Sequence, residues 1–119
     1  MIKIGNNISE FSVYSCQPKT KKELLEIIKY RISKEGTNCD LNDIDVSQIK
    51  DMSYLFAWSK FNGDISKWNV SNVNNMNDMF TYSRFNGDIS KWKINKDCDI
   101  RHMFDNCPIK DEYKPELPE

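Results

Sequence analysis

The sequence predicts an α/β repeat fold: a short solenoid of three 24-residue strand–turn–helix units with an N-terminal capping helix. Two observations support this prediction. The octapeptide FNGDISKW occurs at 61–68 and again at 85–92, an offset of 24 residues. Before these copies, an apolar stripe with helical spacing follows the capping-box sequence TKKE at 20–23, which is typical of a helix start.

A third copy becomes visible when the sequence is shifted by another 24 residues toward the N-terminus. Seven apolar positions then recur in all three copies. In chain order they are Leu41, Ile65 and Ile89; Ile44, Trp68 and Trp92; Val46, Val70 and Ile94; Met52, Met76 and Ile100; Leu55, Met79 and Met103; Phe56, Phe80 and Phe104; and Phe61, Phe85 and Ile109. Because a single unit cannot bury its own apolar side, we expect the copies to stack, with Trp68 over Trp92.

Each unit is expected to contain one strand and one short helix. Apolar residues at 65, 68 and 70 suit a strand with one bent position, whereas those at 76, 79 and 80 have the spacing of helical turns over 76–83. Three polar residues precede these turns and are expected to cap them: Asp51, Asn75 and Asp99. Gly63 and Gly87 fall in the return bend, where we expect a positive φ.

The chain is expected to divide into a cap, a repeat region and a tail. Residues 1–38 form the cap, with a helix over about 20–35 that ends at Gly36. Its apolar stripe is expected to cover the first repeat and consists of Leu24, Leu25, Ile28 and Ile32. A short strand is expected at 11–14. Residues 39–110 form the three-repeat solenoid, and 111–119 form an acidic, proline-containing tail that we expect to fray.

The segment DISKWNVSNVNNMNDMF, at 64–80, resembles the repeat of the BspA-like leucine-rich-repeat proteins, whose unit reads D-I-S-x-W-x-V-S-x-V-x-x-M-x-x-M-F. The resemblance covers residues 39–109, and the helix before them is similar to the lead-in helix of many members. It implies a leucine-rich-repeat-like parallel-strand solenoid that contacts other proteins, often at bacterial surfaces, and it implies no catalytic residues. With three repeats and no recognisable export signal or anchor, the chain fits a small intracellular member, of the sort that phages and mobile elements carry.

Composition argues against nucleic acid and membranes as direct partners. The formal net charge is −1, and arginine occurs only at positions 31, 84 and 101. The start of the sequence lacks the apolar region of a secretory signal, and no apolar run is long enough to span a bilayer. We therefore expect a cytoplasmic location, in a bacterium or an infected host, with the four cysteines reduced.

Catalytic and metal chemistry have weak sequence signals. Cys98, His102 and Cys107 form the one cluster that resembles a metal site, but their repeat slots are expected to face opposite sides of the unit. The single histidine has no matched nucleophile and orienting acid, and the four glycines form no phosphate-binding loop. We therefore expect no enzyme activity, no metal and no cofactor. The slot of Trp68 and Trp92 holds an isoleucine in the first copy, which favours core over ligand stacking.

Two surfaces are candidates for partner binding. On the helical face, Tyr54 and Trp58 stand four residues apart and Tyr82 repeats the slot of Trp58; exposed tyrosine and tryptophan are favoured as interface anchors. The alternative is that Trp58 and Tyr82 simply stack on each other. On the sheet face, charge is expected to run from acidic to basic along the stack, through Asp43, Asp45, Lys67, Lys91 and Lys93. The alternative there is an ordinary solvated face.

The sequence therefore predicts a non-catalytic protein–protein interaction module with a protein partner of unknown identity. One alternative is a small phage or mobile-element inhibitor that docks on a host defence protein, such as a CRISPR effector nuclease. Its support is small size, no recognisable export signal and an asparagine- and lysine-rich composition typical of AT-rich genomes. A second alternative is a structural or surface protein that self-associates through the ends of its stack.

Overall fold

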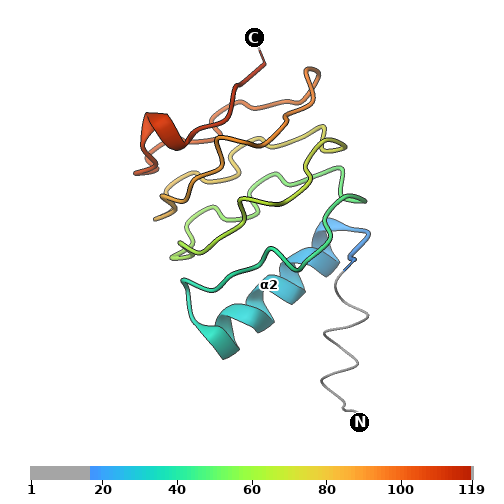
Figure 1. Ribbon diagram of the computed structural model, residues 1–119, viewed down its shortest axis with the longest axis vertical. Helices are drawn as coiled ribbons and strands as arrows, with labels where there is room; N and C mark the ends of the chain where they lie inside the picture. The colour runs from blue at the N-terminus through green and yellow to red at the C-terminus, as the bar shows by residue number, and fades with distance from the viewer. Residues whose placement is uncertain (1–16, 119) are drawn as a thin grey trace.

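The computed structural model describes residues 17–118, so the strand expected at 11–14 lies outside the described residues. An α-helix, α2 (Lys21–Glu35), lies at one end of an elongated body, and a short 3-10 helix, η1 (Asp111–Tyr113), lies near the other. Between them the chain crosses the body in successive layers that follow one another in sequence order (Figure 1). A single hydrophobic cluster with many aromatic rings runs through these layers.

The expected capping helix is confirmed, together with both of its end signals. The Thr20 hydroxyl accepts a hydrogen bond from the Glu23 backbone N–H at 3.1 Å, while the Glu23 carboxylate accepts one from the Lys19 N–H at 2.8 Å. At the other end Gly36 has a φ of 93° and donates its N–H to the Ile32 carbonyl. Leu24, Ile27 and Ile28 are buried on the helix. The stripe therefore includes Ile27, which the sequence analysis left out.

The predicted α/β leucine-rich-repeat solenoid is wrong. Within residues 17–118 the structure contains no β-strand, and α2 and η1 are its helices. In place of a parallel sheet there are three isolated parallel bridges, which join Asp40 to Asp64, Asp51 to Asn75, and Asn75 to Asp99. Each unit is instead a succession of tight turns. Turns interrupt the extended backbone every few residues, so a ladder of paired strands cannot develop.

The short helix expected over 76–83 is also wrong, because two turns occupy this segment. Met79 donates its N–H to the Met76 carbonyl and Ser83 donates to Phe80, each a bond between residues three apart. Asp78 and Tyr82, the third residues of these turns, have φ values of 58° and 55°. Type II turns need a positive φ at this position, whereas an α-helix cannot contain one. Two such turns bury positions i, i+3 and i+4 as a helix would, which explains the misassignment.

Residues one repeat apart do lie on one another, as the sequence analysis expected. Backbone bonds join neighbouring layers at regular intervals, for example Met52 N–H to the Asn75 carbonyl at 2.8 Å and Phe56 N–H to the Met79 carbonyl at 2.9 Å. Trp68 stacks on Trp92 with ring centroids 6.4 Å apart. The Phe56–Phe80 and Phe80–Phe104 pairs stack at 5.6 and 5.7 Å. Such contacts between equivalent aromatic rings explain why the repeat keeps the same residue types.

The glycines of the return bend have a different role from the one expected. Gly36 is the glycine with a positive φ in the described residues, whereas Gly63 and Gly87 are not in that region. At Gly63 an added Cβ would lie 1.8 Å from the Cys39 carbonyl oxygen. Gly63 is therefore required because two layers approach each other too closely for any side chain.

Both ends of the layered body are covered within the described residues. Helix α2 contributes its buried leucine and isoleucines to the common core at the first layer. The C-terminal segment, expected to fray, instead packs on the last layer: Ile89 donates its N–H to the Tyr113 carbonyl at 3.0 Å and Pro115 is buried. The Lys114 ammonium lies 5.4 Å from the centre of the Phe104 ring. The division at residues 38 and 110 stays a prediction.

Candidate functional site

Three large aromatic side chains that the sequence analysis singled out are exposed and adjacent. Tyr54, Trp58 and Tyr82 are 51%, 66% and 58% exposed, respectively. The rings of Tyr54 and Trp58 are nearly parallel with centroids 6.1 Å apart, and those of Trp58 and Tyr82 are nearly parallel at 6.4 Å. Trp58 stacks on Tyr54 of its own layer and on Tyr82 of the next layer, and we call these three rings the aromatic ridge. The stacking of Trp58 on Tyr82 is confirmed, and the rings also remain exposed to solvent, whereas their use as interface anchors stays a prediction.

The stacking of the aromatic ridge leaves ring faces available. Parallel rings in full face-to-face contact lie about 3.5–4.0 Å apart, so centroids 6.1 and 6.4 Å apart mean that neighbouring rings do not cover each other completely. Part of each ring face therefore remains uncovered. A partner could therefore contact ring faces as well as edges.

The backbone beneath the aromatic ridge is in an unfavourable conformation. Tyr54 and Trp58 both have a φ of 58° and Tyr82 has a φ of 55°. The left-handed region suits glycine and asparagine and is unfavourable for bulky residues, because Cβ crowds the following carbonyl oxygen. The same turns in the third unit carry His102 and Asn106, at φ values of 58° and 54°. Asp78 occupies the slot of Tyr54 in the second unit, also at a φ of 58°, so each of the two turn positions accepts a polar residue without a large ring and the fold itself does not require tyrosine or tryptophan here.

Two cations stand beside the aromatic ridge without an ion-pair partner among the described residues. Lys60 and Arg84 are exposed and lie two residues beyond Trp58 and Tyr82. The layers hold them together, since Trp58 donates its N–H to the Thr81 carbonyl at 2.9 Å and Arg84 donates to the Ser59 carbonyl at 3.1 Å. The sequence analysis missed these cations, although their equivalent slots in the 24-residue repeat could have revealed them.

The carboxylates nearest the aromatic ridge are each engaged. Asp78 accepts a hydrogen bond from the Thr81 hydroxyl at 2.9 Å, and its hydrogen bond with the Tyr54 hydroxyl raises the pKa of that tyrosine. Asp51 pairs with Lys21 at 3.6 Å. His102 Nδ1 lies 2.7 Å from the Asp105 carboxylate.

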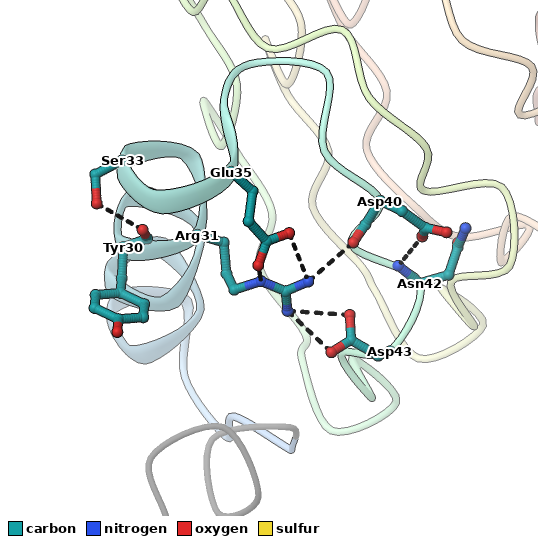
Figure 2. Close-up of polar contacts among 7 residues, drawn as sticks. All are labelled: Tyr30, Arg31, Ser33, Glu35, Asp40, Asn42 and Asp43. Carbon is teal, nitrogen blue, oxygen red and sulfur yellow. Dashed lines mark hydrogen bonds and ion pairs between the residues drawn. The ribbon is translucent and has the colours of Figure 1, made fainter. Parts of the chain in front are cut away.

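The second candidate surface differs from the expected charged sheet face, because no sheet exists in residues 17–118. Its acidic end is occupied by contacts within the chain. Arg31 of α2 binds both carboxylate oxygens of Asp43, at 2.9 and 3.0 Å, and also pairs with Glu35 (Figure 2). The side-chain amide of Gln17 donates to the Asp45 carboxylate at 3.0 Å. These two aspartates help to hold the N-terminal cap to the first layer and are not free acidic groups.

The basic end of this second surface is open. Lys67, Lys91 and Lys93 are exposed, and none of them forms an ion pair with a residue in the described range 17–118. At the acidic end, Arg31 neutralises Asp43, whereas the neutral Gln17 amide leaves the charge of Asp45 in place. The basic end is a solvated basic strip without an apolar anchor.

The remaining candidates lie in structural positions. Trp68 and Trp92 are each 4% exposed, and their indole N–H groups donate to the Leu41 and Ile65 carbonyls, so their assignment to the core is confirmed. Cys98 is buried, whereas His102 is exposed and pairs with Asp105. The Cys107 thiol donates to the Phe85 carbonyl at 3.2 Å. Burial raises the pKa of the Cys98 thiol. Among residues 17–118 no cluster of three potential metal ligands occurs.

The described part of the chain is thus a small repeat protein made of stacked turns, with one exposed aromatic ridge. Residues 27–112 match the family described as Mycoplasma protein of unknown function, DUF285, and the chain belongs to that family. No curated protein matches the chain, and no solved structure matches it. Neither of the helices in residues 17–118 has the length and apolar character needed to cross a membrane.

Proposed function

We propose that this protein is a non-catalytic protein–protein interaction module related to the BspA-like repeats, and that the aromatic ridge is its docking surface. The observation that carries the proposal is the placement of Tyr54, Trp58 and Tyr82. Three large rings are exposed at backbone positions that disfavour them, where the third unit uses smaller residues. Strain that the fold does not require is most readily explained by a role at the surface.

The chemistry of the aromatic ridge suits protein contacts. Tryptophan and tyrosine are enriched among the residues that contribute most to interface affinity, since they bury a large area and lose little side-chain entropy. The basic strip at Lys67, Lys91 and Lys93 has less support as a primary site, because exposed charges without an apolar anchor add mainly to association rate.

A capture experiment tests the proposal. The tagged protein would be incubated with lysate of the native host or a related bacterium, beside the Trp58→Ala variant, and bound proteins would be identified by mass spectrometry. Lys91→Ala serves as the matched control on the other candidate surface. We expect a dominant partner that the parent and Lys91→Ala retain and Trp58→Ala loses. Equal capture by Trp58→Ala, with the partner lost in Lys91→Ala, would assign binding to the basic strip and contradict the proposal.

The identity of the captured protein also separates the narrower hypotheses. A host nuclease would favour an inhibitor of host defence. Self-association through the ends has less support, because α2 covers the first layer and residues 111–118 pack on the last one. A second copy captured through the aromatic ridge would be a different form of self-association, and mass measured against concentration would reveal it.

A further inference from the structure

The charge and spacing of the aromatic ridge indicate the chemistry of its partner. Lys60 and Arg84 lie two residues beyond Trp58 and Tyr82, and neither has an ion-pair partner in residues 17–118. Among the nearby acids, Asp51 pairs with Lys21 and Asp105 lies 2.7 Å from His102, while Asp78 accepts hydrogen bonds from the Thr81 and Tyr54 hydroxyls. Lys60 and Arg84 are therefore cations beside Trp58 and Tyr82 that no acid within residues 17–118 neutralises.

The distance between the rings matches an extended polypeptide. The ring centroids are separated by 6.1 and 6.4 Å. An extended chain rises about 3.2–3.4 Å per residue, so side chains on one of its faces recur about every 6.4–6.8 Å. Two alternate residues of such a segment could each lie against one of two neighbouring rings, with the third ring to one side, because Tyr54 and Trp58 belong to one layer and Tyr82 to the next.

We infer that the aromatic ridge binds an extended, acidic segment of a partner protein, with apolar or proline side chains against the rings and carboxylates at Lys60 and Arg84. The inference rests on the proposed function and adds the partner's chemistry to it. Single-stranded nucleic acid, which also combines planar groups with negative charge, fits less well. Adjacent stacked bases lie about 3.4 Å apart, roughly half the ring spacing, and the chain carries a net charge of −1.

Fluorescence anisotropy with labelled probes tests the inference. The probes are a short peptide that alternates glutamate with proline around one phenylalanine, the same peptide with lysine in place of glutamate, and oligothymidine. The proteins are the parent, the Lys60→Glu/Arg84→Glu double variant, and Lys67→Glu/Lys91→Glu as a control with the same change of charge elsewhere. Both double variants change only exposed side chains, and thermal melting would establish that they fold.

We expect the acidic peptide to bind the parent and the control variant, more weakly at high salt. The Lys60→Glu/Arg84→Glu variant should bind it about tenfold more weakly and should prefer the lysine peptide. Equal binding of both peptides by the parent, or equal loss in both double variants, would overturn the inference, as would binding of oligothymidine in preference to the acidic peptide. If Trp58→Ala loses a captured partner while Lys60→Glu/Arg84→Glu retains it at full affinity, the acidic-segment inference fails and the proposed function stands.

Discussion

The backbone at Trp58 has a φ of 58°, a conformation that costs a residue of this kind about 1–2 kcal/mol. Asparagine adopts it more readily, because its short side chain can hydrogen-bond locally, and Asn106 occupies the same slot in the third unit. Alanine would keep the unfavourable backbone and also lose the ring contacts. Substitutions at position 58 can therefore distinguish the residue type that the turn prefers from the residue type that partner binding needs.

We expect Trp58→Asn to be more stable than Trp58→Ala by about 1 kcal/mol in free energy of unfolding. Both variants should lose partner binding, since both remove the central ring of the aromatic ridge. Urea unfolding of the two purified variants measures the difference. If the asparagine variant were the less stable one, the backbone at position 58 would not be a source of strain.

Trp68 is the opposite case, because its indole ring is 4% exposed and its N–H donates to the Leu41 carbonyl at 2.9 Å. Trp68→Ala should lower the free energy of unfolding by about 3–5 kcal/mol, through lost packing and a cavity between the layers. Thermal or urea unfolding measures the effect beside Trp58→Ala, whose ring is exposed. Equal stability of the two variants would contradict the assignment of Trp68 to the core.

At the scale of the element, the repeating turn is built around an aspartate or asparagine that accepts bonds from a serine two residues later. Asp64 accepts from both the N–H and the hydroxyl of Ser66, at 2.9 and 2.7 Å. Asn69 accepts from Ser71 in the same way, at 3.1 and 2.7 Å. Such turns satisfy backbone donors that a helix or a sheet would otherwise use. They explain how the chain folds with so little regular secondary structure.

These turns make stability depend on acid pH. The hydrogen bonds from Asn42 and then from Ser66 hold the pKa of Asp64 below its usual range, and contacts with Arg101 lower that of Asp99 to about 2. A carboxyl with a lowered pKa in the folded state contributes its stability above the ordinary value near pH 4 and loses it as pH falls toward the lowered value. We expect the free energy of unfolding to decline between about pH 4 and pH 2.

Asp64→Asn isolates one such group, because the asparagine oxygen can still accept both bonds from Ser66, as Asn69 does from Ser71, and the amide cannot titrate. This variant should lose less stability than the parent between pH 5 and pH 3 in urea unfolding, while Ser66→Ala should weaken the turn at both pH values. Identical pH profiles for the parent and Asp64→Asn would show that Asp64 does not contribute to the acid sensitivity.

The close approach of two layers at the return bend can be tested by substituting its glycines. Gly63→Ala should lower the free energy of unfolding by about 3 kcal/mol, because its Cβ would meet the Cys39 carbonyl oxygen at 1.8 Å. Gly87→Ala should cost less, since a phenylalanine ring is close at both sites but the nearest backbone atom to the added Cβ at position 87, the Gly63 carbonyl oxygen, is 3.2 Å away. Thermal unfolding of the two variants checks the order. A smaller cost at Gly63 than at Gly87 would contradict the described packing of the first two layers.

The sequence predicted α2 and its caps, the 24-residue correspondence and the buried tryptophans, because these depend on local chemistry or on direct repetition. It did not predict the absence of strands. Apolar residues at 76, 79 and 80 satisfy both a helix and a pair of tight turns, and the positive φ of Tyr82 leaves no signal because tyrosine normally avoids that region.

For the candidate site, too, the sequence predicted some features and not others. The three aromatic residues could be singled out by their residue types and repeat slots, whereas the extent of Trp58 exposure and the binding of Asp43 by Arg31 could not be predicted. That ion pair joins the capping helix to the first layer, and its geometry depends on how the two pack. The sequence shows that Lys60 and Arg84 occupy equivalent positions of the repeat. Their nearness to the aromatic ridge follows from the inter-layer hydrogen bonds at Trp58 and Arg84, which the sequence does not show.

At the scale of the whole molecule, one surface feature of the described residues differs from the rest. The ends of the layered body are covered by α2 and by residues 111–118, and the acidic groups of the second candidate surface are bound within the chain. The aromatic ridge is the place where large apolar side chains of the described residues remain grouped and exposed. We therefore propose that a protein partner covers this ridge.

The most direct measurement is NMR of the three indole N–H signals in the ¹⁵N-labelled protein, with and without the captured partner. Trp58 is the exposed tryptophan, whereas Trp68 and Trp92 are buried with their N–H groups bonded. The account predicts that the Trp58 signal shifts or broadens on complex formation while the other two stay in place. A complex that leaves the Trp58 signal unchanged would contradict it, because the partner would then bind elsewhere on the molecule.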